Sequence, residues 1–248
     1  MVKPAGDSGE NALPPDAEAV RLSEVVFSWP GQARETLRLP HFAVSGGEHV
    51  LVSGPSGSGK STLLSLIGGI LVPTAGLVFV GGQGLSRLTG ARRDAFRGDH
   101  IGFIFQQFNL VPYLSITENV LIPCRLSAAR RTRASARSGS PEKAAASLLE
   151  RLDMAPALWN RPVTKLSVGQ QQRVAAARAL VGAPPLIIAD EPTSALDEEH
   201  RSAFLRLLVQ ECEEARASLI FVSHDQGLAR IFHRHIRLTE INLAGAET

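Results

Sequence analysis

One glycine-rich loop constrains the fold of this chain more than any other feature. It reads Gly54-Pro55-Ser56-Gly57-Ser58-Gly59-Lys60-Ser61-Thr62 and lies between an apolar stretch at 49–53, which predicts a strand, and another at 63–71, which predicts a helix. Glycine at Gly54, Gly57 and Gly59 allows positive φ and lets several backbone N–H groups face one anion, and the helix that follows points its N-terminal partial positive charge at the same place. The pattern predicts a phosphate-binding loop in an α/β fold, with Lys60 on the β- and γ-phosphates and Ser61 on Mg²⁺.

The composition is that of an ordinary globular chain. It has 248 residues, of which 44% are apolar and 20% charged, so it can bury one sizeable core as a single domain. A net charge of +2 gives no argument for a nucleic-acid partner. Cys124 and Cys212 lack the spacing of metal ligands or redox pairs, and we expect both to be reduced, small apolar residues.

Neither a secretion signal nor a membrane span is predicted. Residues 1–19 contain Gly, Pro and acidic residues without an apolar core, which is typical of a disordered tail. The long uncharged run 61–86 is interrupted by paired glycines and by a turn at 73–76, so it predicts a helix, a turn and a strand. Any membrane role therefore requires a separate subunit.

Two adjacent carboxylates follow a continuous apolar run at 186–189, which predicts a buried parallel strand that ends at Asp190 and Glu191. Burying adjacent carboxylates is costly unless a cation or a reaction uses them. Beside a phosphate loop, Asp190 would hold Mg²⁺ in its outer sphere and Glu191 would orient or deprotonate the attacking water. Without that loop the pair would be interpreted as a helix cap.

Trp29, Gln106 and His224 each stand at the end of a predicted strand. His224 is a site candidate, because the carboxyl ends of strands line the ligand crevice of open α/β sheets. Trp29 is either an aromatic that stacks on adenine or a half-buried strand aromatic. Gln106 either reaches a metal or an attacking water, or it merely closes a strand ladder.

The stretch between Glu118 and Glu142 contains no acid and is rich in Arg, Ser and Ala. Its arginines are Arg125, Arg130, Arg131, Arg133 and Arg137. The pattern predicts a solvated, flexible basic loop. Two interpretations stay open, namely contact with anionic lipid head groups or an acidic partner surface, and a plain exposed insertion.

A second helix start with anion-binding character lies downstream. Ser167-Val168-Gly169-Gln170 opens an alanine-rich helix, with Ser167 as the expected N-cap. Such a start presents free N–H groups to an anion. Because serine caps are common, this stretch acquires a function only from its context.

Together these stretches resemble the ATP-binding cassette (ABC) ATPases in order and spacing. The resemblance covers residues 20–238 and rests on the loop 54–62, Gln106, the segment 166–170, Asp190-Glu191, Ser194-Ala195-Leu196-Asp197 and His224. It implies an α/β P-loop NTPase fold in one domain, 20–240. A mixed β-sheet core lobe would span 20–106 and 182–240, an inserted α-helical lobe would span 107–181, and tails would occupy 1–19 and 241–248.

The resemblance also implies roles for individual residues. The phosphates of ATP would be bound by Gly54, Pro55, Ser56, Gly57, Ser58, Gly59, Lys60, Ser61 and Thr62, and the adenine by Trp29. Mg²⁺ would be held by Ser61, Gln106 and Asp190, and catalysis would involve Glu191, His224, Lys60 and Gln106. The ATP of a second cassette would be met by the signature residues Ser167, Gly169 and Gln170 and by the D-loop residue Asp197. Val168 departs from the family pattern, which usually has glycine there.

A single chain holds one phosphate loop and one signature, so the resemblance implies a homodimer that sandwiches two ATP. It also implies an integral membrane permease and a cytoplasmic position on the inner face of the membrane, with membrane contact only through the permease or the stretch Arg125–Arg137. The segments 101–106, 108–112 and 117–120 look most like the lipoprotein-releasing and macrolide-efflux ATPases. The alternative is a cell-division regulator that controls a cell-wall hydrolase through a membrane partner.

Overall fold

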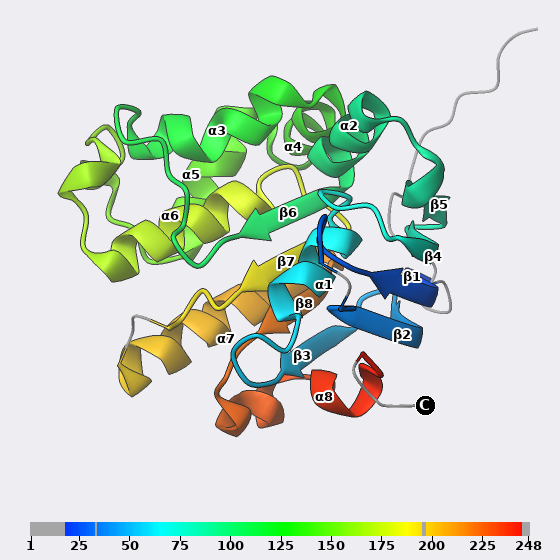
Figure 1. Cartoon of the computed structure of the whole chain (residues 1–248). Helices are drawn as coiled ribbons and strands as arrows, with labels where there is room; N and C mark the ends of the chain where they lie inside the picture. The colour runs from blue at the N-terminus through cyan, green and yellow to red at the C-terminus, as the bar shows by residue number, and fades with distance from the viewer. Residues whose placement is uncertain (1–17, 33, 195–196, 245–248) are drawn as a thin grey trace, which may run out of the picture.

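Two β-sheets packed on either side of one helix form the centre of the molecule (Figure 1). The computed structural model describes residues 18–32, 34–194 and 197–244. A parallel sheet has the strand order β6-β7-β8-β3-β9, and an antiparallel sheet has the order β2-β1-β4-β5. The predicted core with strands of both directions is therefore present, divided into two sheets.

Strands and helices both occur along the whole described chain, with strands β1 to β3 first and helices α3 to α6 in succession between β6 and β7. The strands are β1 (Glu18–Phe27), β2 (Leu37–Ser45), β3 (His49–Ser53), β4 (Ala75–Val80), β5 (Gln83–Gly84), β6 (Ile101–Ile104), β7 (Leu186–Asp190), β8 (Ser218–Val222) and β9 (Arg234–Arg237). The helices are α1 (Lys60–Ile67), α2 (Gly90–His100), α3 (Ile116–Leu126), α4 (Ala128–Ser138), α5 (Pro141–Arg151), α6 (Val168–Leu180), α7 (Glu198–Ala215) and α8 (Leu238–Ile241).

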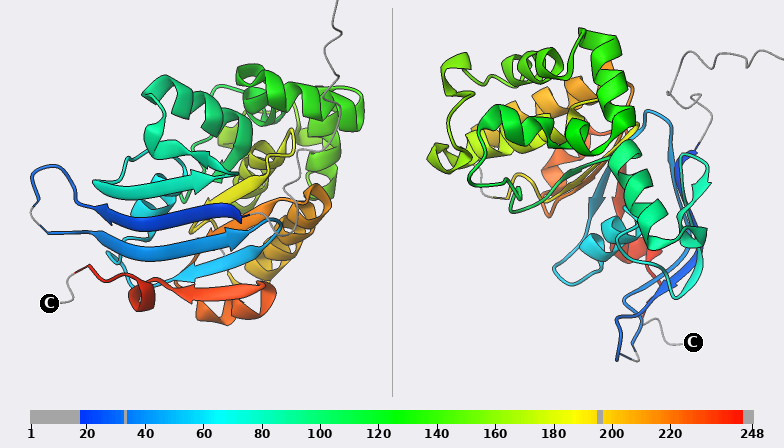
Figure 2. Two further views of the ribbon diagram at one scale, coloured as in Figure 1. Left: turned by 90° about the vertical axis from the view of Figure 1, so that its right-hand side faces the viewer. Right: turned by 90° about the horizontal axis from the view of Figure 1, so that it is seen from above.

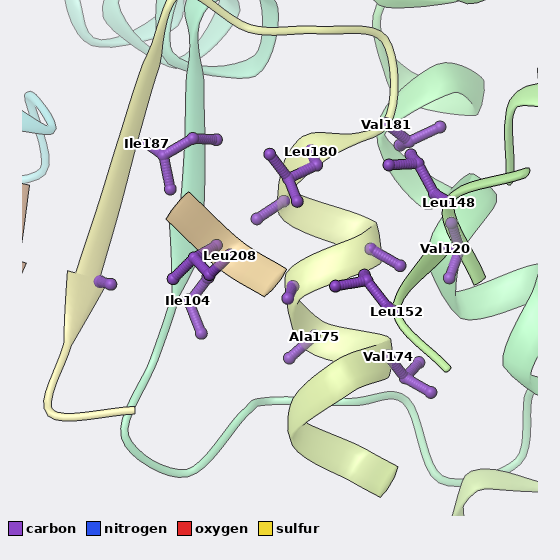
Figure 3. Packing of buried hydrophobic residues seen from close by; sticks show 14 of the residues in the cluster. Ile104, Val120, Leu148, Leu152, Val174, Ala175, Leu180, Val181, Ile187 and Leu208 are labelled. Atoms are coloured by element: carbon purple, nitrogen blue, oxygen red, sulfur yellow. The ribbon is translucent and has the colours of Figure 1, made fainter. Parts of the chain in front are cut away.

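The central strands β7, β8 and β3 of the parallel sheet are buried on both faces, which explains why they are largely apolar, whereas the edge strand β9 is polar and partly exposed. Successive residues of β7 point to opposite faces. Leu186 and Ile188 join a core that includes α1 and the antiparallel sheet. Ile187 and Ala189 join a second core that includes α6 and α7. Figure 3 shows this second core, in which α6 lies against β6 and β7.

Helices α3 to α6 gather on the side of the parallel sheet that lies away from the antiparallel sheet (Figure 2). Side chains fix where they begin. Ser115 and Glu118 form a reciprocal capping box at α3. Ser140 caps α5 with Pro141 in its first turn. Ser167 and Gln170 form another capping box at α6, so the predicted N-cap of that helix is confirmed.

The arginine-rich stretch is helical and largely anchored to the protein, so the prediction of a flexible basic loop is wrong. It forms the end of α3 and all of α4, with Ser127 as the cap between them. The Arg130 side chain is 1% exposed. Its guanidinium donates to the carbonyls of Ala179 (3.0 Å), Val181 (3.0 Å) and Ile101 (2.8 Å).

The physical reason is the end of α6, whose last carbonyls have no partner within the helix. Arginine carries several N–H donors in a fixed fork, so one side chain can satisfy several such carbonyls. Arg133 donates to the carbonyls of Gly182, at 2.7 Å, and of Asp99. Arg137 donates to the carbonyl of Glu214 at 3.0 Å. Arg130 and Arg133 therefore join α4 to the core, while Arg137 stays exposed and ties the end of α4 to α7.

Ordered structure reaches into both segments that the sequence predicts as tails. Strand β1 begins at Glu18, where its register with Ser45 starts. At the other end, the Asn242 side chain accepts from the Arg38 N–H (2.9 Å) and donates to the carbonyls of Thr36 (3.1 Å) and Ser58 (3.4 Å). Asn242 therefore links the start of β2 to the glycine loop. The remainder of each predicted tail lies outside the described residues.

Replacing Arg130 tests its structural role. In Arg130→Met, three carbonyls lose a charged donor inside the protein, and we expect the free energy of unfolding in urea to fall by about 3 kcal/mol. Arg125→Met is the matched control, since Arg125 is an exposed arginine of the same stretch. The control should stay within about 0.5 kcal/mol of the parent chain. An equal, small loss in both variants would contradict the anchoring role.

Candidate nucleotide site

One cavity of about 410 Å³ collects most of the predicted site residues from five separate segments. Its lining consists of Trp29, Thr36, Ser56, Gly57, Gly59, Lys60, Ser61, Thr62, Gln106, Glu191 and His224. Pro55 and Ser58 instead line a neighbouring cavity of about 530 Å³ on the outer side of the loop. Thr36, next to β2, was not predicted, and nothing in the sequence around it marks it as a site residue.

The glycine loop curls around the start of α1, which begins at Lys60. Gly57 and Gly59 have φ of 78° and 98°, which side-chain-bearing residues rarely adopt. Gly54 does not have positive φ, which corrects the prediction. A side chain is excluded at Gly54 by lack of space, because an added Cβ would lie 2.7 Å from the Ser58 hydroxyl. No side chain caps α1, so the first N–H groups of the helix stay available to an anion.

Lys60 lies folded back over the loop and is 6% exposed. Its ammonium donates to the carbonyls of Gly54 and Pro55, both at 2.9 Å. The Glu191 carboxylate lies 3.7 Å away. A phosphate in the cavity would offer this ammonium a stronger, charged partner than the two carbonyls.

Glu191 lies where the ends of β7 and β8 meet the loop. Its backbone has φ of 45° and donates to the Val222 carbonyl at 3.1 Å. Its carboxylate lies 2.5 Å from Nε2 of His224, whose Nδ1 faces the Gly54 carbonyl at 3.1 Å. His224 therefore bridges the carboxylate and the phosphate loop.

Asp190 ends β7 beneath the cavity. The Ser61 side chain hydrogen-bonds its carboxylate, and its other oxygen, Oδ1, is buried without a hydrogen-bond partner. Burial raises the pKa of this carboxyl above its ordinary value, and the negative charge of Glu191 adds to the rise, while the Ser61 hydrogen bond opposes it. An ionised oxygen left unpaired in the interior is costly, and a hard cation would supply the missing partner.

Trp29 lies at the mouth of the cavity with 41% of its surface exposed. Its ring meets Phe27 edge to face, with centroids 5.2 Å apart and planes at 86°. This contact holds the indole beside the cavity and is consistent with stacking on a flat base. Gln106 follows β6 and is exposed into the same cavity.

The second group of predicted residues lies outside the cavity. Ser167, Gly169 and Gln170 open α6, where the Ser167 hydroxyl accepts from the Gln170 N–H at 3.3 Å. Val168 is the first residue of the helix and does not have positive φ, so this position needs no glycine. Asp197 caps α7 by accepting from the His200 N–H at 2.9 Å. Ala195 and Leu196, between Ser194 and Asp197, lie outside the described residues.

The fold and the site define a P-loop ATPase. A sequence profile of the family described as "ABC transporter" matches residues 37–194, and the chain belongs to that family. It is therefore an ATP-binding, ATP-hydrolysing subunit of an ABC transporter.

This chain is similar in sequence to bacterial relatives over most of their length. The chain is 41% identical over 192 residues to the "Lipoprotein-releasing system ATP-binding protein LolD" of Xylella fastidiosa, with 77% of each chain covered. It is 39% identical over 223 residues to the protein of the same name from Novosphingobium aromaticivorans, covering 89% of this chain and 96% of the relative. Among solved structures, the dimeric ATP-binding cassette MJ0796 bound to ADP and Pi has a TM-score of 0.75 and 34% identity, covering 88% and 94% of the two chains.

Removing the Asp190 charge should stabilise the folded chain and at the same time weaken its binding of ATP with Mg²⁺. The raised pKa means that ionisation costs more in the folded chain than in the unfolded one, and this cost is present above the folded-state pKa. We therefore expect Asp190→Asn to raise the free energy of unfolding at neutral pH without nucleotide. The advantage should shrink as pH falls through the Asp190 pKa. Urea unfolding over a pH series measures it.

The same variant should bind ATP in the presence of Mg²⁺ about tenfold more weakly or worse, because the negative charge that would face the cation is lost. Isothermal calorimetry with and without Mg²⁺ gives the comparison. An Asp190→Asn chain that is both less stable and unchanged in Mg²⁺-dependent binding would contradict the interpretation of the unpaired oxygen.

Proposed function

We propose that this chain is the ATPase subunit of a lipoprotein-release transporter and that it acts on the inner face of the cell membrane as an ATP-sandwiching homodimer with a separate permease. The observation that carries the lipoprotein assignment is the shared name of the relatives reported above, which are similar over most of their length. The same observation favours transport over the cell-division alternative.

We assign the roles within one chain from the cavity. Lys60 and the loop N–H groups bind the β- and γ-phosphates, while Trp29 stacks on the adenine. Glu191 orients and deprotonates the attacking water. His224 holds the Glu191 carboxylate at 2.5 Å and ties it to the loop through the Gly54 carbonyl. Because the contacts to phosphate and to water come from different side chains, binding and chemistry can be separated by mutation.

Mg²⁺ fits the oxygen donors beneath the cavity. The Ser61 hydroxyl and the unpaired Asp190 Oδ1 lie together there, and Gln106 lies in the cavity lining. Hydroxyl, carboxylate and amide oxygens are the ligands that this hard cation prefers. When bound, Mg²⁺ would neutralise phosphate charge during the reaction.

Ser167, Gly169, Gln170 and Asp197 have no place in the cavity of their own chain. They lie at the exposed starts of α6 and α7. At α6 the capping box takes up the N–H groups of Ser167 and Gln170, which leaves those of Val168 and Gly169 to face an anion, and a second chain can supply the γ-phosphate. The dimeric cassette MJ0796 matches 88% of this chain and 94% of its own, which supports the pairing.

Glu191→Gln tests the sandwich. The variant should lose about 10²-fold or more in hydrolysis, keep ATP binding, and accumulate as a dimer with ATP and Mg²⁺. Adding Ser167→Arg in the same chain should block the dimer, because the bulky cation would enter the γ-phosphate region of the partner. Light scattering with and without ATP reads out both. A Glu191→Gln chain that stays monomeric at saturating ATP would contradict dimerisation without the permease.

A groove of about 300 Å³ between β6, α2 and α3 is the surface that we assign to the permease. Its lining is mainly apolar, and Ile70 and Leu126 remain 48% and 83% exposed at its rim. Exposed apolar patches of this kind mark partner sites. Among the described residues, no helix is long and apolar enough to cross a membrane. We infer that a short apolar helix of the permease occupies the groove.

Leu126→Asp tests this docking. A charge at the rim would face the apolar helix of the permease, so co-purification of the permease in mild detergent should fall about tenfold or more. ATP hydrolysis by the isolated chain should stay unchanged, since Leu126 lies outside the nucleotide cavity. Leu243→Asp is the matched control, an exposed leucine near the C-terminus. Equal recovery of the permease with both variants would exclude this groove as the docking surface.

A further inference from the structure

The loop after Gln106 has an unusual backbone. Phe108 and Asn109 follow each other in the left-handed region, with φ of 58° and 49°. Asparagine tolerates this conformation, but for Phe108 it costs roughly 1–2 kcal/mol and persists only where surrounding contacts enforce it. The Phe108 ring is 8% exposed and belongs to the core of the helical side, so the loop is anchored on one side by packing.

The second anchor is Arg178, on the helix that begins at Ser167. Its guanidinium donates to the carbonyl of Asn109 at 2.7 Å and to that of Phe108 at 2.5 Å. The two left-handed residues thus present consecutive carbonyls to one planar fork, a geometry that arginine matches and lysine does not. Burial lowers the pKa of this guanidinium relative to its ordinary value, so desolvation of the cation is part of the cost of the contact.

Gln106 is confined between this anchor and β6. On one side, β6 pairs with β7, ending with Ile104 opposite Ala189. On the other side, Phe108 donates its N–H to the Phe105 carbonyl at 2.9 Å and is held by Arg178. These two flanks fix the place at which the Gln106 backbone meets the cavity, whereas a loop free to leave the left-handed region would move Gln106 away from it.

We propose that Arg178 is a positioning residue for the nucleotide site: by binding the Phe108 and Asn109 carbonyls, it holds the loop that presents Gln106 to the bound nucleotide. The inference rests on the proposed function through the role of Gln106. Arg178 also lines the apolar groove assigned to the permease. A partner helix in that groove therefore meets the side chain that holds Gln106 in place.

Kinetics of the full-length chain test the positioning role. Arg178→Met should lower kcat about tenfold through misplacement of Gln106. KM for ATP should change less than kcat, since the loop N–H groups, Lys60 and Ser61 stay in place. Lysine cannot bridge both carbonyls, so the kcat of Arg178→Lys should lie between that of Arg178→Met and that of the parent chain. In a chain that already carries Gln106→Ala, Arg178→Met should lower kcat no further, because two substitutions that act through the same group do not have additive effects.

Hydrogen exchange supplies a readout that is independent of activity. The amides of 107–110 should exchange at least about tenfold faster in Arg178→Met, since the strained loop loses its anchor. Arg173→Met is the matched control, because Arg173 lies on the same helix but binds Asp153 instead. Unchanged exchange at 107–110, or multiplicative losses of kcat in the double variant, would overturn the role of Arg178. A Gln106→Ala chain with full turnover would instead overturn the proposed role of Gln106 in the site.

Discussion

The shape of the glycine loop is the constraint on which the rest of the site depends, and distant segments hold that shape through its carbonyls. The Gly54 carbonyl accepts from Lys60 and faces His224, while the Ser58 carbonyl accepts from Asn242. His224 follows β8, and Asn242 follows β9 and α8. Because β3 lies between β8 and β9 in the sheet, both segments end beside the loop that leaves β3. The strand order thus converts three separate stretches of sequence into one anion cradle.

The site is built at a cost in stability. Asp190 and Glu191 stand side by side where β7 ends, and the ammonium of Lys60 lies 3.7 Å from Glu191, while one Asp190 oxygen is buried without a hydrogen bond. Glu191 additionally adopts a left-handed backbone. Such features persist where function requires them, since a nucleotide and its cation supply the partners that the protein lacks. The neighbouring sheet and helices, buried on both faces, provide the compensating stability.

Helix α6 connects the proposed signature site, at its start, to strand β6, which leads to Gln106 in the nucleotide cavity. Its N-terminal turn is exposed and offers Ser167 outward. Its C-terminal end is fixed: an added Cβ on Gly102 of β6 would lie 2.3 Å from the Ala179 carbonyl, so helix and strand touch directly there, and Arg130 binds the last carbonyls. The exposed signature is therefore carried by a helix whose far end is tied to the strand leading to Gln106.

The sequence alone determined the phosphate loop, the strand that delivers Asp190 and Glu191, and the cap of α6, because each depends on local spacing and on the period of apolar residues. The roles of Gly54 and of the arginine-rich stretch were decided by tertiary structure. Charge pattern predicted solvated arginines, yet Arg130 lies buried because unpaired carbonyls from α6 and β6 converge on it. Thr36, Arg178 and Asn242 likewise gain their roles from long-range contacts that no local pattern records, since their partners are brought to them by the order of the strands and the packing of α6.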